Sequence, residues 1–143
     1  MMDAKVISRD ICSGGDIKLS AGGSTFIYHR PRAGILLVTI SGLDIGQFGT
    51  TTLDEISAAI NRDGKIELFI DAQRSDGAVV AVSEEWTRFF ASNREKLSRV
   101  HVLVGSEVLK LIVSIAQHLS RTGNLIQIHT SEEIFFQKLQ AAG

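Results

Sequence analysis

Apolar residues near the start of the chain fall in short runs separated by turn-forming residues. Residues 26–29 and 35–41 are rich in β-branched and aromatic side chains, and Pro31 and Gly34 lie between them. Two such runs joined by a short connection predict a β-hairpin. Residues 16–20 predict one further short strand before the hairpin.

After the hairpin, the period of the apolar positions changes from that of a strand to that of a helix. The positions that repeat at helical spacing are Leu53, Ile56 and Ile60. Thr52 and Glu55 have the spacing of a capping box, and Gly64 is typical of the residue that follows a helix. The pattern predicts a first helix that begins near Thr52 and stops at Gly64.

The second predicted helix is bounded by two short apolar strands, at residues 66–70 and 100–104. We expect it to start at Ser83, because Ser83 followed by two glutamates is a good helix start and the valine-rich stretch 78–82 is a poor helix former. Its apolar side carries Trp86, Phe89, Phe90 and Leu97. Trp86 is therefore expected to be largely buried against the sheet.

Two more helices flank a last apolar strand at residues 125–129. The third helix runs from about Ser106 to Arg121, with Gly123 closing it, and the fourth begins at Thr130 or Ser131. Glu133 could complete a capping box with Thr130. The third helix is apolar over a broad arc, which favours deep burial or an additional contact surface. The arc consists of Val108, Leu111, Ile112, Ile115, Ala116 and Leu119.

This order of elements predicts an α/β fold. Alternating strands and helices require parallel strands joined by right-handed crossovers, whereas the two hairpin strands are antiparallel. The expected architecture is a mixed, mostly parallel sheet with an N-terminal antiparallel hairpin and four helices. Residues 1–24 form an N-terminal extension with the short strand, and residues 25–143 form the domain.

In open sheets of this kind, ligands bind outside the carboxyl ends of the parallel strands. These ends are expected at residues 42–49, 71–82, 105–107 and 130–132.

Composition narrows the classes of partner. The 143 residues carry 15 Lys and Arg against 16 Asp and Glu, and no basic run is present, so we expect no nucleic-acid partner. No window approaches the roughly 18 apolar residues of a transmembrane helix, which predicts no membrane insertion. The first 16 residues lack the apolar centre of a signal peptide, so a cytoplasmic location is expected.

No catalytic, metal or cofactor site stands out in the sequence. His29, His101, His118 and His129 are dispersed without the short spacing of metal ligands, and the lone Cys12 is interpreted as an ordinary thiol. Neither a phosphate-binding lysine motif nor a dinucleotide-binding glycine pattern is present. We therefore expect a protein that is not an enzyme and binds no cofactor.

Three segments of the chain nevertheless carry a family resemblance. They are residues 34–42, residues 65–71 leading to Gly77, and Val104-Gly105-Ser106 before the third helix. Together with the order of elements, these segments resemble the SpoIIAA-like branch of the STAS family of bacterial regulatory domains. The resemblance covers roughly residues 26–139, and these domains are related in fold to lipid-carrying CRAL-TRIO proteins.

The resemblance implies a candidate site after the central strand. Anti-sigma-factor antagonists of the family carry Asp-Ser-Ser-Gly there, and a partner kinase phosphorylates the serine before the glycine. Here the matching segment is Arg74-Ser75-Asp76-Gly77, so Asp76 stands at the phosphoserine position and Ser75 one position earlier. We expect no phosphorylation switch at the family position. The candidate partner-binding region consists of Asp71, Arg74, Ser75, Asp76 and Gly77.

The residues themselves also allow plainer roles. Ser75 is interpreted as a turn or helix N-cap hydroxyl, and Asp76 as a carboxylate in the first turn of a helix.

The leading hypothesis is a non-enzymatic regulatory or binding module that acts through a protein partner, which the resemblance implies to be a kinase or an anti-sigma factor. The alternative is a carrier of a small apolar or lipid-like ligand, suggested by the broad apolar arc of the third helix and by the related folds. A metal-independent enzyme ranks third. If exposed, Phe48, Phe135 and Phe136 would contribute to a homodimer.

Overall fold

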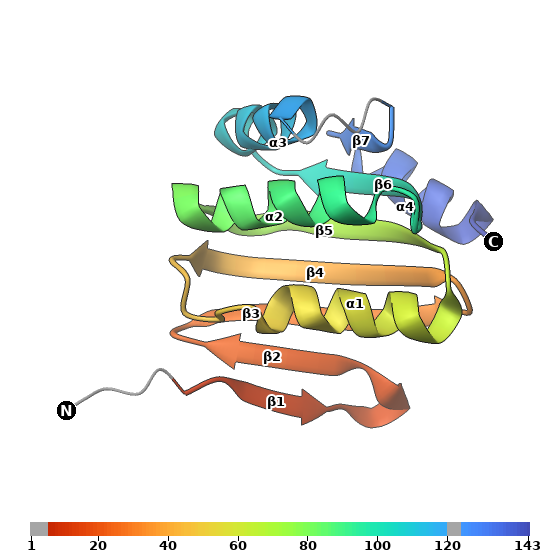
Figure 1. Cartoon of the computed structure of the whole chain (residues 1–143), viewed down its shortest axis with the longest axis horizontal. Coiled ribbons are helices and arrows are strands. Elements are labelled where there is room, and N and C mark those ends of the chain that lie inside the picture. Colours follow the sequence, from red (N-terminus) through yellow and green to blue (C-terminus); the bar gives the residue numbers. More distant parts are fainter. Residues whose placement is uncertain (1–5, 120–123) are drawn as a thin grey trace.

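The computed structural model describes residues 6–119 and 124–143, and this part forms one sheet covered by helices on both faces (Figure 1). The neighbours in the sheet follow the chain order without exception. The strands are β1 (Ser8–Ile11), β2 (Ile17–Ala21), β3 (Ser24–Arg32), β4 (Ile35–Asp44), β5 (Ile66–Ala78), β6 (Leu97–Val104) and β7 (Ile126–His129). The helices are α1 (Thr51–Asp63), α2 (Val80–Asn93), α3 (Glu107–Leu119) and α4 (Glu132–Ala141).

The predicted α/β class is confirmed. The pairs from β1 to β4 are antiparallel and the pairs from β4 to β7 are parallel. As a result β2, β4, β5, β6 and β7 run in one direction. The hairpin is formed by β3 and β4, and the predicted short strand is β2.

The chain order of the strands decides which face each helix covers. Right-handed crossovers between successive parallel neighbours place α1, α2 and α3 on one face of the sheet. Their side chains and the sheet form the main hydrophobic core, which includes Phe26, Val38, Ile56, Leu68, Phe90 and Val100. Helix α4 follows the last strand and packs on the opposite face (Figure 1).

The segment before residue 25 adds two strands to the edge of the sheet. In β2, Leu19 is fully buried in the main core, whereas every residue of β1 is exposed. Arg9 on β1 donates to the Glu55 carboxylate of α1 over 2.7 Å. An exposed pair of this kind contributes only about 0–1 kcal/mol, so burial in β2 is what fixes this segment.

The first helix starts differently from the prediction. Helix α1 begins at Thr51, and Thr52 is buried, so the predicted capping box between Thr52 and Glu55 is wrong. The hydroxyl of Thr50 instead donates to Asp54 over 3.0 Å. The predicted end is confirmed: Gly64, with a φ of 84°, donates its N–H to the carbonyl of Ile60.

The second helix begins earlier and ends earlier than predicted. Val79 is extended, and the N–H of Ser83 already donates to its carbonyl over 3.0 Å, so α2 starts at Val80 and the predicted start at Ser83 is wrong. Leu97 is the first residue of β6 and does not belong to the helix. Trp86 is half-buried, which is less than expected.

The third and fourth helices have serine caps. The Ser106 hydroxyl accepts from the N–H of Leu109 before α3, and the Ser131 hydroxyl accepts from the N–H of Ile134 in α4. The predicted capping box between Thr130 and Glu133 is therefore wrong. The predicted end of the third helix, with Arg121 and Gly123, lies outside the described residues.

The described apolar side chains of α3 lie in two environments. Of the predicted arc, Val108, Leu111 and Ile115 are exposed, whereas the side chains of Ile112, Ala116 and Leu119 lie outside the described part. Leu109, which the arc did not include, is buried in the main core.

A second, smaller core lies under α4. Phe135 packs there with Ile35, Phe69 and Leu103, and its ring meets that of Phe69 edge-on at 5.6 Å. Phe48 is buried as well, in the main core. Phe48 and Phe135 therefore do not meet the condition of exposure on which the homodimer expectation depends, and Phe136 is half-buried.

Phe135→Ala should destabilise the fold by about 3–5 kcal/mol, because the ring is 0% exposed and its removal leaves a cavity under α4. Ile134→Ala, at a neighbouring side chain that is 49% exposed, is the matched control and should cost much less. Urea unfolding followed by circular dichroism measures both values. Equal losses in the two variants would contradict this packing of α4.

Candidate functional site

Strand β5 is longer than the sequence predicts. It runs to Ala78 and stays paired with β4, with Gly42 opposite Ser75 and Asp44 opposite Ala78. The predicted strand over residues 66–70 is therefore too short, and residues 71–78, which were expected to follow it, belong to it. Two register shifts interrupt the ladder in this part, and they break the alternation by which a strand is recognised in a sequence.

Asp71 holds the first of these irregularities together. Its side chain is buried, and its Oδ1 atom accepts from the backbone N–H of Gln73 over 3.1 Å and from the Gln73 amide over 3.2 Å. Gly105 on the next connection allows this bend, because a Cβ atom there would lie 2.7 Å from the carbonyl oxygen of Gln73. The position of Asp71 indicates a structural role.

The other four predicted site residues follow on the same strand but face different ways. Arg74 and Asp76 are exposed, whereas Ser75 and Gly77 line a cavity on the face that α1, α2 and α3 cover. The Ser75 hydroxyl accepts from the N–H of Gly77 over 3.1 Å, as expected for a turn hydroxyl. Asp76 lies in the strand and not in the first turn of α2. Whether this region binds a partner stays a prediction.

Exposed apolar side chains gather where β4 ends and α2 begins. We call the set Leu43, Ile45, Val79 and Val80 the carboxyl-end patch. Leu43 pairs with Gly77 across the ladder, and the N–H of Val79 donates to the carbonyl of Asp44 over 3.0 Å, so the two segments lie side by side. The patch does not follow from the sequence pattern, because no local spacing relates Leu43 and Ile45 to the two valines.

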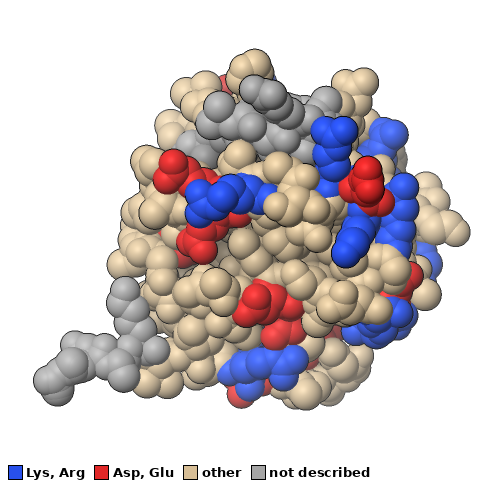
Figure 2. All heavy atoms as spheres, in the orientation of Figure 1, with Lys and Arg blue, Asp and Glu red and all other residues tan. Residues whose placement is uncertain are grey.

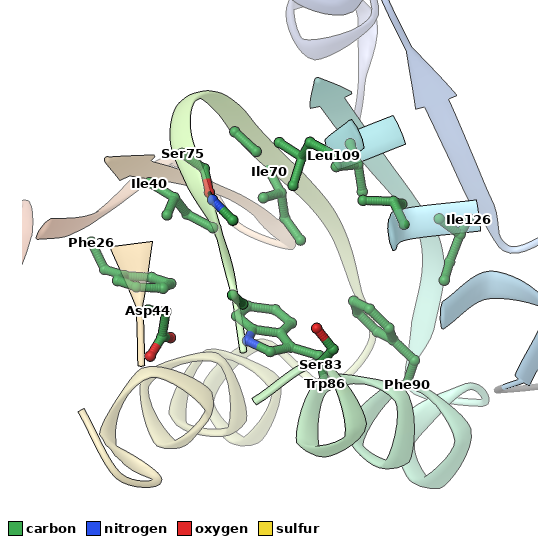
Figure 3. A pocket seen from close by; sticks show the side chains of 15 residues that line it. Phe26, Ile40, Asp44, Ile70, Ser75, Ser83, Trp86, Phe90, Leu109 and Ile126 are labelled. Carbon is green, nitrogen blue, oxygen red and sulfur yellow. Dashed lines mark hydrogen bonds between the residues drawn. The ribbon is translucent and has the colours of Figure 1, made fainter. Parts of the chain in front are cut away.

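A cavity of about 110 Å³ lies beneath the same region, between the sheet and helices α2 and α3 (Figure 3). Its wall is mostly apolar and aromatic. The lining includes Phe26, Ile70, Trp86, Phe90, Val102 and Leu109, together with the polar residues Asp44, Ser75 and Ser83.

Asp44 is the charged group of this wall. It is only 7% exposed, and its Oδ1 atom accepts from the N–H of Gly46 over 3.0 Å. Burial raises the pKa of this carboxyl, and the nearby charge of Glu85 raises it further, whereas the hydrogen bond from Gly46 lowers it. Among the described residues, no three His, Cys, Asp or Glu side chains are grouped to hold a metal ion.

Two solved structures of other proteins superpose on this chain. No family model and no curated protein matches the chain. An uncharacterised protein with a SpoIIAA-like fold from Shewanella loihica PV-4 superposes with a TM-score of 0.61 at 13% identity, over 82% of this chain and 94% of that chain. An anti-sigma factor antagonist from Mycobacterium paratuberculosis superposes with a TM-score of 0.55 at 14% identity, over 82% of this chain and 95% of that one.

The chain has a SpoIIAA-like fold. This confirms the resemblance to STAS domains at the level of the fold, and both superpositions cover most of the chain. On one face of this SpoIIAA-like domain, acidic and basic side chains are interspersed among uncharged atoms (Figure 2). None of the helices in the described part is long and apolar enough to cross a membrane.

A hydrogen-bonded network lies on the face of the sheet that α4 covers, beside Phe69 and Phe135. His101 is buried; its Nε2 atom lies 2.7 Å from a Glu67 carboxylate oxygen and its Nδ1 atom 3.0 Å from Nε2 of His129. Both contacts can be hydrogen bonds if the two histidines are neutral. His101 then donates Nε2–H to Glu67, and its Nδ1 atom accepts a hydrogen bond from Nε2–H of His129. The histidines have no short spacing in the sequence, but the pairing of β5, β6 and β7 brings Glu67, His101 and His129 together.

Protonation of this network is disfavoured in the folded state. Burial lowers the pKa of His101, against the opposing effect of Glu67, and burial also lowers the pKa of His129. Below the ordinary histidine value of 6.5 the unfolded chain binds protons that the folded chain does not yet bind. These histidines therefore contribute stability above pH 6.5 that is lost as the pH falls through the window below it.

The free energy of unfolding should accordingly decrease as the pH falls from 7 toward 5, and His101→Gln should make this decrease shallower although the variant is less stable throughout. Urea unfolding at a series of pH values gives the slope. His118→Gln is the control, because His118 is exposed on α3, and it should keep the slope of the unaltered protein. A slope unchanged in His101→Gln would contradict the proposed protonation state.

Proposed function

We propose that this domain is a non-enzymatic regulatory module that binds a protein partner through the carboxyl-end patch. The observation that supports it best is the patch itself, in which four large apolar side chains on two adjoining segments are exposed together. Contiguous exposed apolar groups with a polar rim are typical of protein interaction sites. Arg74 and Asp76, both exposed on the adjacent strand, supply charges at that rim.

The partner is proposed to be a kinase or an anti-sigma-factor-like protein. The likeness to the Mycobacterium paratuberculosis anti-sigma factor antagonist supports this class of partner. Asp76, at the position where the family carries its phosphoserine, offers a permanent negative charge for such a partner to bind. Because Asp76 occupies the family position and Ser75 lines the cavity, control by phosphorylation is not part of the proposal.

The remaining parts of the proposal concern where the domain acts. We propose a cytoplasmic protein that has no nucleic-acid partner. The net charge of −1 supports the second part of this proposal.

The alternative of a lipid carrier receives little support from the cavity. Ligand pockets usually measure about 300–1,000 Å³, and a lipid chain needs a long apolar tunnel, whereas this cavity measures about 110 Å³. The cavity is better matched to a much smaller molecule.

Val80→Asp should abolish capture of the partner from a lysate of the native host, because it places a charge at the most exposed position of the carboxyl-end patch. Substitution of a hot-spot residue near the centre of an interface costs about 2 kcal/mol or more, or roughly thirtyfold in affinity. Asp76→Asn should weaken capture and Ser75→Ala should change it little. Quantitative mass spectrometry of proteins retained on the immobilised domain provides the readout.

Val108→Asp is the matched control: Val80 is 76% exposed and Val108 71%, but Val108 lies on α3 outside the patch. Thermal unfolding verifies that each variant is folded. Proteins retained by the unaltered domain and by Val108→Asp but lost with Val80→Asp are the expected result. Loss with Val108→Asp alone would move the interface to α3 and overturn the proposal.

A further inference from the structure

Polar groups around the cavity have hydrogen-bonding capacity that the described residues do not use. Asp44 accepts one hydrogen bond, at Oδ1, and its second carboxylate oxygen has no donor among the described residues. The indole of Trp86 also lines the cavity. Figure 3 shows the nitrogen edge of the indole turned to the side on which Asp44 lies. No buried side-chain nitrogen or oxygen in the described part lacks a partner, so the second carboxylate oxygen of Asp44 is accessible to a ligand that enters the cavity.

The charge of this wall favours a cation. Within residues 6–119 and 124–143, no basic side chain forms an ion pair with Asp44, and the nearby charged group that affects it is another acid, Glu85. A buried carboxylate without a counter-ion is unfavourable, and a bound cation would neutralise it. An anionic ligand would meet repulsion, and a purely apolar ligand would bury the carboxylate further.

The shape and the aromatic lining favour a single ring. The Trp86 ring lies with its centroid 6.4 Å from that of Phe26 and 5.8 Å from that of Phe90, so three aromatic side chains surround the space. A cavity of roughly 150 Å³ takes up benzene, and this one of about 110 Å³ has an open side that accommodates a substituent. Aromatic faces also attract organic cations.

We propose that this cavity binds a small arylalkylamine, with the protonated amine on Asp44 and the aromatic ring against Trp86 and Phe90. The site is distinct from the carboxyl-end patch and does not depend on the protein partner proposed above. It also differs from a lipid carrier in the size and in the charge of its ligand.

The fluorescence of Trp86 reports binding directly, because Trp86 is the sole tryptophan of the chain. Benzylamine is the probe, and benzyl alcohol and benzoate are its neutral and anionic counterparts of similar size. At neutral pH, benzylamine should change the emission saturably with a Kd of about 1 mM or tighter. Benzyl alcohol should bind at least about tenfold more weakly, and benzoate should not bind, because charged hydrogen bonds contribute more than neutral ones. This comparison uses the unaltered protein and depends on no variant.

Asp44→Asn tests the assigned anchor and should weaken benzylamine binding by about tenfold or more while leaving benzyl alcohol unchanged. Asp10→Asn makes the same charge change at an exposed position on β1 and should bind benzylamine as the unaltered protein does. Absence of a saturable change with benzylamine would overturn the proposal. Equal affinities for benzylamine and benzyl alcohol, or an unaltered benzylamine affinity in Asp44→Asn, would overturn it as well.

Discussion

The parallel pairing of β4 with β5 is the interaction on which the rest of this structure depends. It continues past Asp71 to the pair of Asp44 and Ala78, through two register shifts. Backbone hydrogen bonds in such a ladder are maintained across a bulge only if the extra residues have partners of their own. The Asp71 carboxylate accepts a hydrogen bond from the backbone N–H of Gln73, and Gly105 leaves room for the carbonyl of Gln73. The end of β5, the start of α2 and the wall of the cavity all follow from this continued pairing.

The two faces of the sheet consequently differ in character. On the face covered by α1, α2 and α3, the strand ends leave a partly open aromatic cavity with one buried carboxylate. On the face covered by α4, Phe69 and Phe135 close a compact apolar core beside the network of Glu67, His101 and His129. On the face with the cavity, the second carboxylate oxygen of Asp44 accepts no hydrogen bond from the described residues, and we infer ligand binding there. The polar groups of the second face satisfy one another, which indicates a structural role that depends on pH.

Sequence patterns predicted the elements with strong periodicity, and they failed where tertiary contacts override local preference. The hairpin, the parallel strands and the end of α1 at Gly64 follow from alternation and turn chemistry. The start of α2 does not follow from such patterns, because valine is a poor helix former. The helix begins at Val80, directly after Val79, whose N–H donates to the carbonyl of Asp44. The cavity likewise required knowledge of which residues meet: Asp44, Ser83 and Trp86 carry no shared spacing. The serine caps of α3 and α4 were locally visible, but Thr130 was a competing candidate.

Native-state hydrogen exchange tests the continued pairing of β4 and β5 most directly. Amides in hydrogen-bonded strands exchange only through local or global opening and are protected by orders of magnitude compared with those of mobile loops. If β5 extends to Ala78 and its end is fastened to Asp44, the amide of Val79 should be protected nearly as strongly as those of residues 67–70 in the centre of the strand. Exchange of the Val79 amide at the rate of an unprotected loop would contradict the extension of β5 and with it the geometry of both proposed sites.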